Sequence, residues 1–384
     1  MCSSARAFLL NCFFLWGQLT GQECLFLLLR CFIVLLFTIF VGWNIVFRLL
    51  TMRLYTKEES VKRMNELGAL RRPFIFVINY NQDASYIEEP DAVDSAELLF
   101  DFNGYSNARE AALSGADVVH PASAVSWQTY PESFDSYQRS FQIVRNHILA
   151  GNSFLTNLTC ETPVETNLTL KVIYERSHAL YKLWVKDAFT VFSPEIFVRI
   201  KNGVVYSYPM KGTIDASLPN AAQSLMEDEK EAAEHATIVD LIRNDLSMIA
   251  DRVHVSRYRY IDTLHTNRGG ILQTSSEIQG VLPADFYPQL GTLLFRLLPA
   301  GSITGAPKKK TTEIIQQAET YERGFYTGIM GYFDGENLDS AVMIRFVEQR
   351  DNHLFFKSGG GITCQSDALS EYNEMKQKVY VPIC

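Results

Sequence analysis

The sequence predicts an α+β fold, a two-sheet antiparallel β-sandwich flanked by helices. Short apolar, β-branched segments follow one another closely through the middle of the chain, and segments of helical spacing interrupt them in groups without alternating regularly. Asn202-Gly203, between two such segments, is a residue pair that two-residue hairpin turns favour. Strands joined as hairpins and interrupted by helices favour an antiparallel sandwich over a doubly wound sheet.

Each element is predicted from its local pattern. Residues 73–79 should form a buried strand because β-branched and aromatic residues run together there, and a second short strand is expected within residues 97–103. Helical spacing over residues 136–150 ends at Gly151, a suitable C-cap. The further predicted strands are residues 153–159, 168–174, 188–193, 196–200, 204–208, 328–333, 340–348 and 353–358. The further predicted helices are residues 221–250, 287–298, 309–319 and 367–380.

Composition indicates a globular protein of one large or two ordinary domains. The 384 residues are 47% hydrophobic and 20% charged, and no internal repeat or low-complexity stretch is visible. The formal net charge of -8 and the lack of a basic stripe with interleaved aromatic residues argue against a nucleic-acid partner. An anionic ligand would therefore need a local cationic or metal site.

Residues 1–51 differ in composition from the rest of the chain. Residues 24–47 are almost wholly apolar apart from Arg30 and are long enough for one membrane-spanning helix. The alternative, which we favour, is that Met52 is the true start, because an ordinary soluble sequence begins there. A membrane partner is expected only if residues 24–47 belong to the working protein.

Cysteine usage after residue 51 indicates a reducing compartment. Only Cys160, Cys364 and Cys384 remain in that part of the chain, and their spacing forms neither a disulfide framework nor a metal site. Residues 52–384 are therefore expected to form a cytosolic domain.

Residues 299–308 combine features of an anion-binding loop. Gly301 and Gly305 allow backbone N–H groups to approach a ligand closely, Thr304 adds a hydroxyl, and the start of the following helix favours negative charge. Only three residues separate the two glycines, and Lys308 follows a proline, so the loop does not match a nucleotide-binding P-loop and ATP is not expected. A plain turn before a helix is the alternative interpretation.

Two acidic pairs with three-residue spacing place carboxylates on one face of a predicted helix. They are Glu231 with Glu234 and Glu371 with Glu374. Facing one another, the pairs would suit a hard cation such as Mg²⁺, whereas two solvated helix faces are the alternative. Thr237 and Gln377 stand where a di-iron site would need histidine. Residues 359–361, three glycines before the second pair, are expected to form a loop of backbone donors.

Lys211 and Glu195 are candidates for a nucleophile and an acid. Lys211 follows a predicted strand and precedes Gly212, so it is either a surface charge or a nucleophile activated by its surroundings. Glu195 begins a strand that we expect to pair with the strand of Lys211. This hairpin would bring both side chains to one cleft.

Seven motifs in one order resemble those of the chorismate-utilising enzymes. They are Ser193-Pro-Glu195, Pro209-Met-Lys-Gly-Thr213, residues 234–245, residues 301–308, Arg323-Gly-Phe-Tyr-Thr-Gly328, Ile344-Arg345 and residues 359–374. The resemblance covers residues 135–384, with residues 52–134 as a short N-terminal portion, and it implies the fold of anthranilate synthase component I. It is strongest to the aminodeoxychorismate synthase branch, component I, which carries lysine at the position of Lys211 where anthranilate synthases carry alanine.

The resemblance implies that chorismate and ammonia are converted to 4-amino-4-deoxychorismate, on the route to 4-aminobenzoate and folate. Lys211 would attack C2 of the ring while Glu195 protonates the leaving C4 hydroxyl, and ammonia would then add at C4 and expel the lysine. The implied substrate-binding residues are Thr304, Tyr326, Arg345, Gly359, Gly360, Gly361 and Lys378.

The resemblance also implies a Mg²⁺ site. Glu234 and Glu374 would bind the ion directly, and Glu231 and Glu371 would act through water. The ion would grip the ring carboxylate of chorismate and neutralise its charge.

The sequence departs from the family pattern in two places and lacks the motifs of a glutamine-hydrolysing enzyme. Gln273 stands where many relatives carry histidine, and the short segment 52–134 bears on whether the tryptophan pocket of some relatives is retained. No glutamine-hydrolysing triad is visible, so ammonia is expected from a separate glutamine amidotransferase subunit. The alternatives are anthranilate or isochorismate synthesis on the same fold, or a membrane-tethered, non-catalytic carboxylate-binding protein.

Overall fold

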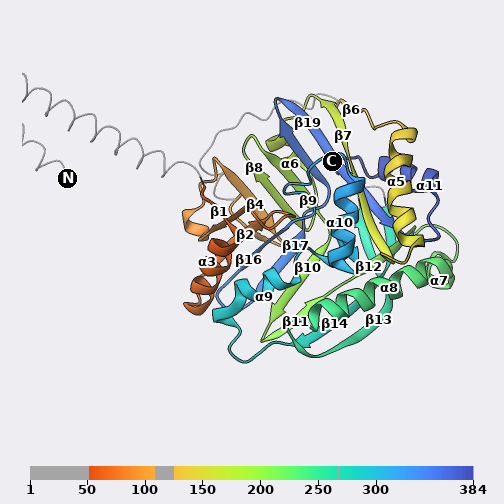
Figure 1. The fold of residues 1–384 in the computed structure, drawn as a ribbon. Helices are drawn as coiled ribbons and strands as arrows, with labels where there is room; N and C mark the ends of the chain where they lie inside the picture. Colours follow the sequence, from red (N-terminus) through yellow and green to blue (C-terminus); the bar gives the residue numbers. More distant parts are fainter. Residues whose placement is uncertain (1–51, 109–124, 267–268, 384) are drawn as a thin grey trace, which may run out of the picture. The chain divides into compact units, whose positions relative to one another are not determined.

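A computed structural model describes residues 52–108, 125–266 and 269–383 (Figure 1). Residues Leu54–Cys384 form one compact unit. The apolar segment 24–47 lies outside the described residues. None of the helices in the described ranges is both long and apolar enough to cross a membrane.

The described strands form two antiparallel sheets, which confirms the predicted sandwich. The strand order of the first sheet is β1 (Leu54–Tyr55), β3 (Ser85–Glu88), β2 (Phe74–Ile78), β16 (Ile329–Phe333), β17 (Leu338–Val342), β10 (Ile196–Lys201), β11 (Val204–Ser207), β14 (Gly269–Val281) and β12 (Met210–Asp215), and β13 (Asp251–Thr266) also pairs with β14. That of the second sheet is β15 (Gly305–Ala306), β7 (Leu155–Thr166), β19 (His353–Ile362), β18 (Phe346–Arg350), β9 (Phe189–Ser193), β8 (Tyr181–Val185), β4 (Leu98–Phe102) and β5 (Tyr105–Ser106), and β6 (Trp127–Thr129) pairs with β7.

Helices cover the edges and outer faces of both sheets. Helices α5, α10 and α11 pack beside β7 and β19, α8 packs against β12 and β14, and α3 packs on α9 (Figure 1). Their bounds are α3 (Lys57–Ala69), α5 (Phe134–Leu149), α6 (Leu170–Arg176), α7 (Ala221–Glu227), α8 (Glu229–Leu246), α9 (Leu290–Leu297), α10 (Lys308–Ala318) and α11 (Ala368–Gln377), with 3-10 turns η1 (Pro90–Ala92), η2 (Tyr287–Gln289) and η3 (Gly301–Ile303).

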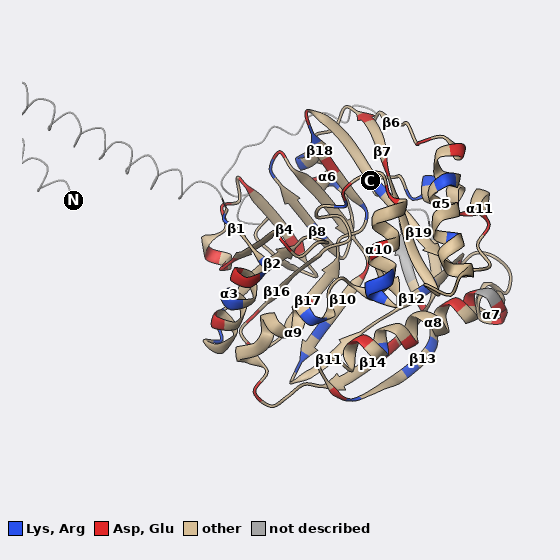
Figure 2. Ribbon diagram, viewed as in Figure 1, with Lys and Arg blue, Asp and Glu red and all other residues tan. Residues whose placement is uncertain are grey.

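The main core lies between α3, α9 and the first sheet. Phe74, Phe76, Ile329 and Leu290 are fully or almost fully buried there. Strands β2, β9 and β17 are buried at every residue, as strands covered on both faces must be. Acidic and basic residues are interspersed along the described part of the ribbon (Figure 2).

The predicted strand at residues 168–174 is wrong, because this segment is helix α6. The Thr169 hydroxyl accepts a hydrogen bond from the backbone N–H of Val172 and caps the helix. Leu170, Ile173 and Tyr174, three and four residues apart, are the buried face. The predicted helix 221–250 is likewise two helices, because Asp228 takes an extended conformation and caps the start of α8.

The predicted strand at residues 340–348 is also two strands, and they belong to different sheets. Arg345 has a positive φ of 55°, which breaks the extended run between β17 and β18. The chain therefore crosses from one sheet to the other at the Ile344-Arg345 motif. The β13–β14 hairpin and β8 were missed, whereas the hairpin turn at Asn202-Gly203 is confirmed, with β10 and β11 paired on either side.

Candidate active site

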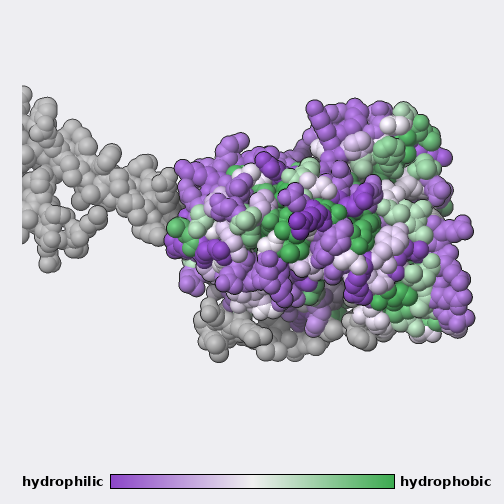
Figure 3. Space-filling view, turned by 90° about the horizontal axis from the view of Figure 1, so that it is seen from below, coloured by the Kyte–Doolittle hydropathy of each residue, from purple (hydrophilic) through white to green (hydrophobic). Residues whose placement is uncertain are grey.

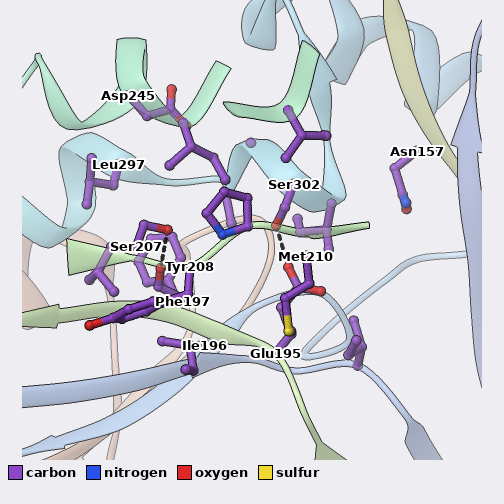
Figure 4. Close-up of a pocket in the computed structure, with 18 of the residues that line it drawn as sticks. Asn157, Glu195, Ile196, Phe197, Ser207, Tyr208, Met210, Asp245, Leu297 and Ser302 are labelled. Carbon is purple, nitrogen blue, oxygen red and sulfur yellow. Dashed lines mark hydrogen bonds between the residues drawn. The ribbon is translucent and has the colours of Figure 1, made fainter. Parts of the chain in front are cut away.

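A pocket lies where the two sheets, α8 and the loop after α9 meet (Figure 4). It contains about 1010 Å³ of empty space, part of it open to solvent. Its lining comes from β10–β12, α8, η3, the segments around Tyr326 and Arg345, and, from the second sheet, Asn157 of β7 and Gly359 of β19. Residues distant in the sequence thus share one cavity, and Glu195, Lys211, Tyr326, Arg345 and Gly359 are the predicted site residues that line it.

Glu195 occupies this pocket at the start of β10. Its backbone N–H donates to Ser193 Oγ at 3.1 Å, and its carbonyl accepts from the backbone N–H of Val342. The Ser302 hydroxyl donates to Glu195 Oε1 at 2.6 Å (Figure 4). Burial raises the pKa of the Glu195 carboxyl, and the Ser302 hydrogen bond and the charge of Lys211 oppose that rise. A carboxyl with a raised pKa suits a proton donor.

Lys211 lies within a further strand, β12, although the expected hairpin of β10 with β11 is confirmed. Strand β12 pairs with β14, not with the strand that Glu195 begins, because β11 and β14 intervene in the sheet. The two side chains nevertheless line the same pocket. Lys211 Nζ lies 3.9 Å from Glu234 Oε2, and 3.7 Å from where a Cβ on Gly361 would stand.

The four glutamates approach the same region from two helices. Glu231 and Glu234 lie on α8, and Glu371 and Glu374 lie on α11. Glu231 Oε2 is 3.1 Å from the position of a Cβ on Gly212, beside Lys211, while Glu371 Oε2 is 3.3 Å from that of a Cβ on Gly360. Glu231 thus lies beside Gly212 and Glu371 beside Gly360, and the Lys211 ammonium lies close to Gly361.

Carboxylate oxygens are ligands that a hard divalent cation prefers, but these four are not arranged in the structure to bind one ion together. Over residues 52–108, 125–266 and 269–383, no three His, Cys, Asp or Glu side chains are placed to hold a metal ion together. Lysine ammonium groups lie against two of the carboxylates instead. Lys378 Nζ is 2.7 Å from Glu374 Oε1, and Lys211 Nζ approaches Glu234.

Gly359, Gly360 and Gly361 form part of strand β19 and not the predicted loop. They pair with Thr159, Leu158 and Asn157 of β7. A Cβ at Gly359 would overlap the carbonyl oxygen of Leu158, so the glycine is needed for the close approach of the two strands. Lys378, at the C-cap of α11, donates to the Gly359 carbonyl at 2.8 Å.

Tyr326 and Arg345 contribute a phenol and a guanidinium to the pocket. Tyr326 is 4% exposed, and burial raises its pKa, so the phenol stays a neutral hydrogen-bond group. Thr327 and Arg345 have positive φ angles of 61° and 55°, a backbone conformation that residues other than glycine rarely adopt. Strained backbone of this kind is concentrated at functional sites.

The loop at residues 299–308 is fixed by buried polar contacts. Lys308 Nζ pairs with Asp245 Oδ2 at 2.7 Å and donates to the Leu297 carbonyl at 2.6 Å, so its charge is already neutralised inside the protein. Ser302 and Ile303 line the pocket. Thr304 Oγ1 is buried and has no hydrogen-bond partner within the described part of the chain, so it has a donor and an acceptor to offer.

Arg323 ties this loop to the second sheet. Its guanidinium pairs with Glu319 through two bonds, donates to the Ile303 carbonyl at 2.9 Å and donates to the Asn157 carbonyl at 2.7 Å. The Arg323–Glu319 pair is almost fully buried. Sequence reasoning noticed Arg323 only as a motif residue, and it missed Ser302 and Asn157 as lining residues because no local pattern marks them.

Gln273, the departure from the family pattern, lies on β14 opposite Thr213 of the neighbouring strand β12. Its side-chain amide donates to Met210 Sδ at 2.8 Å. Gln273 is 7% exposed and is not among the residues that line the pocket. In this structure its amide supports Met210, which itself lines the pocket.

The family described as chorismate binding enzyme matches residues 63–383. The chain belongs to this family. Its fold agrees with a solved structure described as a 2,3-dihydroxybenzoate-specific isochorismate synthase, DhbC, from Bacillus anthracis, which has a TM-score of 0.63 and 19% identity, over 86% of this chain and 89% of that one. At that identity the likeness concerns the fold alone.

Relatives at higher identity differ in their names. A PabA-like protein of Haemophilus influenzae is 46% identical over 85% of this chain and 98% of its own length. Anthranilate synthase component 1 of Acetivibrio thermocellus is 32% identical over 64% of this chain and 52% of its own length. Aminodeoxychorismate synthase component 1 of Bacillus subtilis is 29% identical over 65% of this chain and 55% of its own length. The chain thus matches about half of each of the last two proteins.

Proposed function

We propose that the protein is an aminodeoxychorismate synthase, component I type, which converts chorismate and ammonia to 4-amino-4-deoxychorismate and water. The observation that carries this proposal is the placement of the Lys211 amine and the Glu195 carboxyl in one pocket lined from both sheets. A nucleophile and an acid in one cavity suit a displacement that passes through a covalent intermediate. Membership of the chorismate-binding family supplies the substrate class.

The proposed reaction has two displacements. Lys211 Nζ forms a bond to C2 of the ring, the ring double bonds shift, and the C4–O bond breaks. The hydroxyl leaves as water with a proton from Glu195. Ammonia then bonds to C4 and gives one proton back to the Glu195 carboxylate, the double bonds shift back, and the C2–N bond to Lys211 breaks to release the free amine. Each step is easier than one direct displacement.

Substrate carboxylates would meet cationic and polar groups from both sheets. Arg345 and Tyr326 line the pocket and offer a guanidinium and a phenol to a carboxylate. The Thr304 hydroxyl, which has no hydrogen-bond partner among the described residues, adjoins the lining residue Ile303. Mg²⁺ remains part of the proposal, with Glu234 and Glu374 as ligands and Glu231 and Glu371 acting through water. Because two lysines now lie against these carboxylates, binding of the ion would need them to move. When bound, the ion would neutralise substrate charge.

Anthranilate synthesis is the second candidate, because an anthranilate synthase is as similar to this chain as an aminodeoxychorismate synthase is. A lysine at position 211 argues for the 4-amino product. Ammonia in either case would come from a separate glutamine amidotransferase or from solution.

The test is to incubate the protein with chorismate, MgCl₂ and an ammonium salt and to identify the product by mass spectrometry and ultraviolet absorbance. Lys211→Ala should lower formation of aminodeoxychorismate by at least about a thousandfold, because the covalent route is lost. Its side chain is 27% exposed, so the variant should fold normally. The exposed Lys310→Ala is the matched control and should keep full turnover. Wild-type turnover by Lys211→Ala, or anthranilate as the wild-type product, would refute the proposal.

A further inference from the structure

We propose that Ser302 is a positioning residue for the proton transfer, and that its hydroxyl holds Glu195 in place and stabilises the carboxylate that forms when the proton leaves. This inference rests on the proposed function for the identity of the reaction. Ser302 and Glu195 are 107 residues apart in the sequence, and their contact is a 2.6 Å hydrogen bond between side chains (Figure 4).

Both ends of this hydrogen bond are fixed by the backbone. On one side, the Glu195 backbone is held by Ser193 Oγ and by the backbone N–H of Val342. On the other side, Ser302 is the middle residue of the 3-10 turn η3, which the Thr304 N–H closes onto the Gly301 carbonyl at 3.2 Å. The backbone positions of Ser302 and Glu195 therefore favour this hydrogen bond before any substrate binds.

Buried contacts hold the turn from both neighbours of Ser302. A Cβ on Gly301 would stand 2.7 Å from Asp245 Oδ2, so glycine lets the turn lie close against α8 and a larger residue would have to displace the Asp245 side chain. Asp245 is itself paired with Lys308. Arg323 donates to the Ile303 carbonyl at 2.9 Å. A hydroxyl presented by such a rigid turn is suited to orient a reacting group.

The hydrogen bond decides which oxygen of Glu195 faces the substrate. The Ser302 hydroxyl donates to Oε1, and no hydrogen bond from any described residue reaches Oε2. Three cations also act on this carboxyl: Lys211 from β12, Arg345 from the β17–β18 connection and Lys378 from the end of α11. Without Ser302 the carboxylate would be drawn toward these cations, whereas with it Oε2 is left to carry the proton.

The proton balance follows from this geometry. The proton moves from Glu195 Oε2 to the oxygen of the C4 hydroxyl as the C4–O bond breaks, and water leaves. Glu195 is then an anion in a partly buried site, where a donated hydrogen bond is stronger than in water. Ser302 supplies that bond without moving, because it is already in place before the proton transfer.

The test compares Ser302→Ala, which removes the hydroxyl, with Ser302→Thr, which keeps it. Thr312→Ala is the matched control, because among the described residues its hydroxyl bonds the Lys308 carbonyl within α10, away from the pocket. For Ser302→Ala we expect a loss of about ten- to a hundredfold in kcat with little change in KM, since the lost bond is to a charged group. The fall of activity at high pH should move up by about one pH unit, because Glu195 keeps its proton longer.

A second measurement does not depend on turnover. The infrared carbonyl band of the protonated carboxyl, assigned by its loss in Glu195→Gln, gives the pH midpoint of Glu195 in each variant. This midpoint should rise in Ser302→Ala and return toward the wild-type value in Ser302→Thr, with Thr312→Ala unchanged. Equal midpoints in wild type and Ser302→Ala would overturn the assignment. A shifted midpoint in a protein that forms no aminodeoxychorismate would keep the assignment and refute the proposed function instead.

Discussion

Glu195 is a carboxyl group whose surroundings disfavour its own ionised form. Burial raises its pKa above the ordinary value of 4.5, and the hydrogen bond from Ser302 and the nearby cations compensate only in part. Between pH 4.5 and its raised pKa the folded protein binds more protons than the unfolded chain, so stability falls as the pH rises through this window. Ionisation of Glu195 therefore lowers the stability of the fold at neutral pH, although the proposed chemistry requires this carboxyl.

Glu195→Gln should therefore be more stable than the wild type at pH 7. The amide oxygen still accepts from Ser302, and no buried carboxylate has to form. The gain should disappear below pH 4.5, where the wild-type carboxyl is protonated in both states. Urea unfolding at both pH values measures this difference, and turnover should be lost at either pH. An identical pH dependence for the two proteins would contradict the assigned burial.

At the residue scale, the sequence motifs marked several side chains that line the pocket, but not the residues that hold them in place. Lys211, Glu195, Tyr326 and Arg345 stand in recognisable motifs, and the structure brings them to one pocket. Ser302 lies in the glycine-containing loop, but no sequence pattern gave it a role. Its importance depends on a partner 107 residues away, which no local pattern reveals.

Among the elements, the two-residue strand β15 decides where the substrate loop lies. Gly305 and Ala306 pair with Thr156 and Leu155 of β7, so the loop that carries Ser302 and Thr304 is fastened to the second sheet. Gly305 has a φ of 120°, and a Cβ there would overlap the Leu155 carbonyl oxygen. Both facts require glycine at this position.

Gly305→Ala should cost more than about 3 kcal/mol of unfolding free energy, because strain and a backbone clash act together. In whatever fraction folds, the KM for chorismate should rise because the loop is displaced from β7. Gly104→Ala is the control: its φ is also positive, at 92°, but no atom lies within 4 Å of the added Cβ. The control should cost only about 1–2 kcal/mol. Similar losses for both variants in urea unfolding would show that the contact with Leu155 does not matter.

Element predictions failed where a change of sheet or a helix cap left no trace in the hydrophobic pattern. Residues 340–348 have one apolar, strand-like pattern, yet Arg345 divides them between two sheets. Residues 168–174 contain β-branched residues, but the Thr169 cap and burial of one face make them helical. Local propensity was overridden in both places by packing.

At the scale of the whole molecule, elements that begin just after Met52 are part of the hydrophobic core and of the first sheet. The main hydrophobic cluster draws on residues such as Met64 and Leu67 of α3, and β1 pairs with β3 at the edge of the first sheet. On a space-filling view of one face, hydrophilic and hydrophobic residues are interspersed (Figure 3).

A chain that begins at Met52 should therefore fold and turn over chorismate as the full chain does. Thermal unfolding and kcat/KM measure this directly, with both proteins in the same buffer. A chain that begins at Phe74 is the control and should fail to fold, because it lacks β1 and α3, whose Met64 and Leu67 are buried. A clearly lower unfolding temperature for the Met52 chain would mean that residues 1–51 support the fold.

The sequence by itself determined the α+β sandwich, the Asn202-Gly203 hairpin and the family, because these depend on local patterns and on motif order, and it proposed the reactive side chains from the same motifs. Only the tertiary structure decided that β12 pairs with β14, that β17 and β18 separate into two sheets, and that Ser302 meets Glu195. Contacts between distant residues depend on how the two sheets pack over the whole chain, so nearest-neighbour preferences do not specify them.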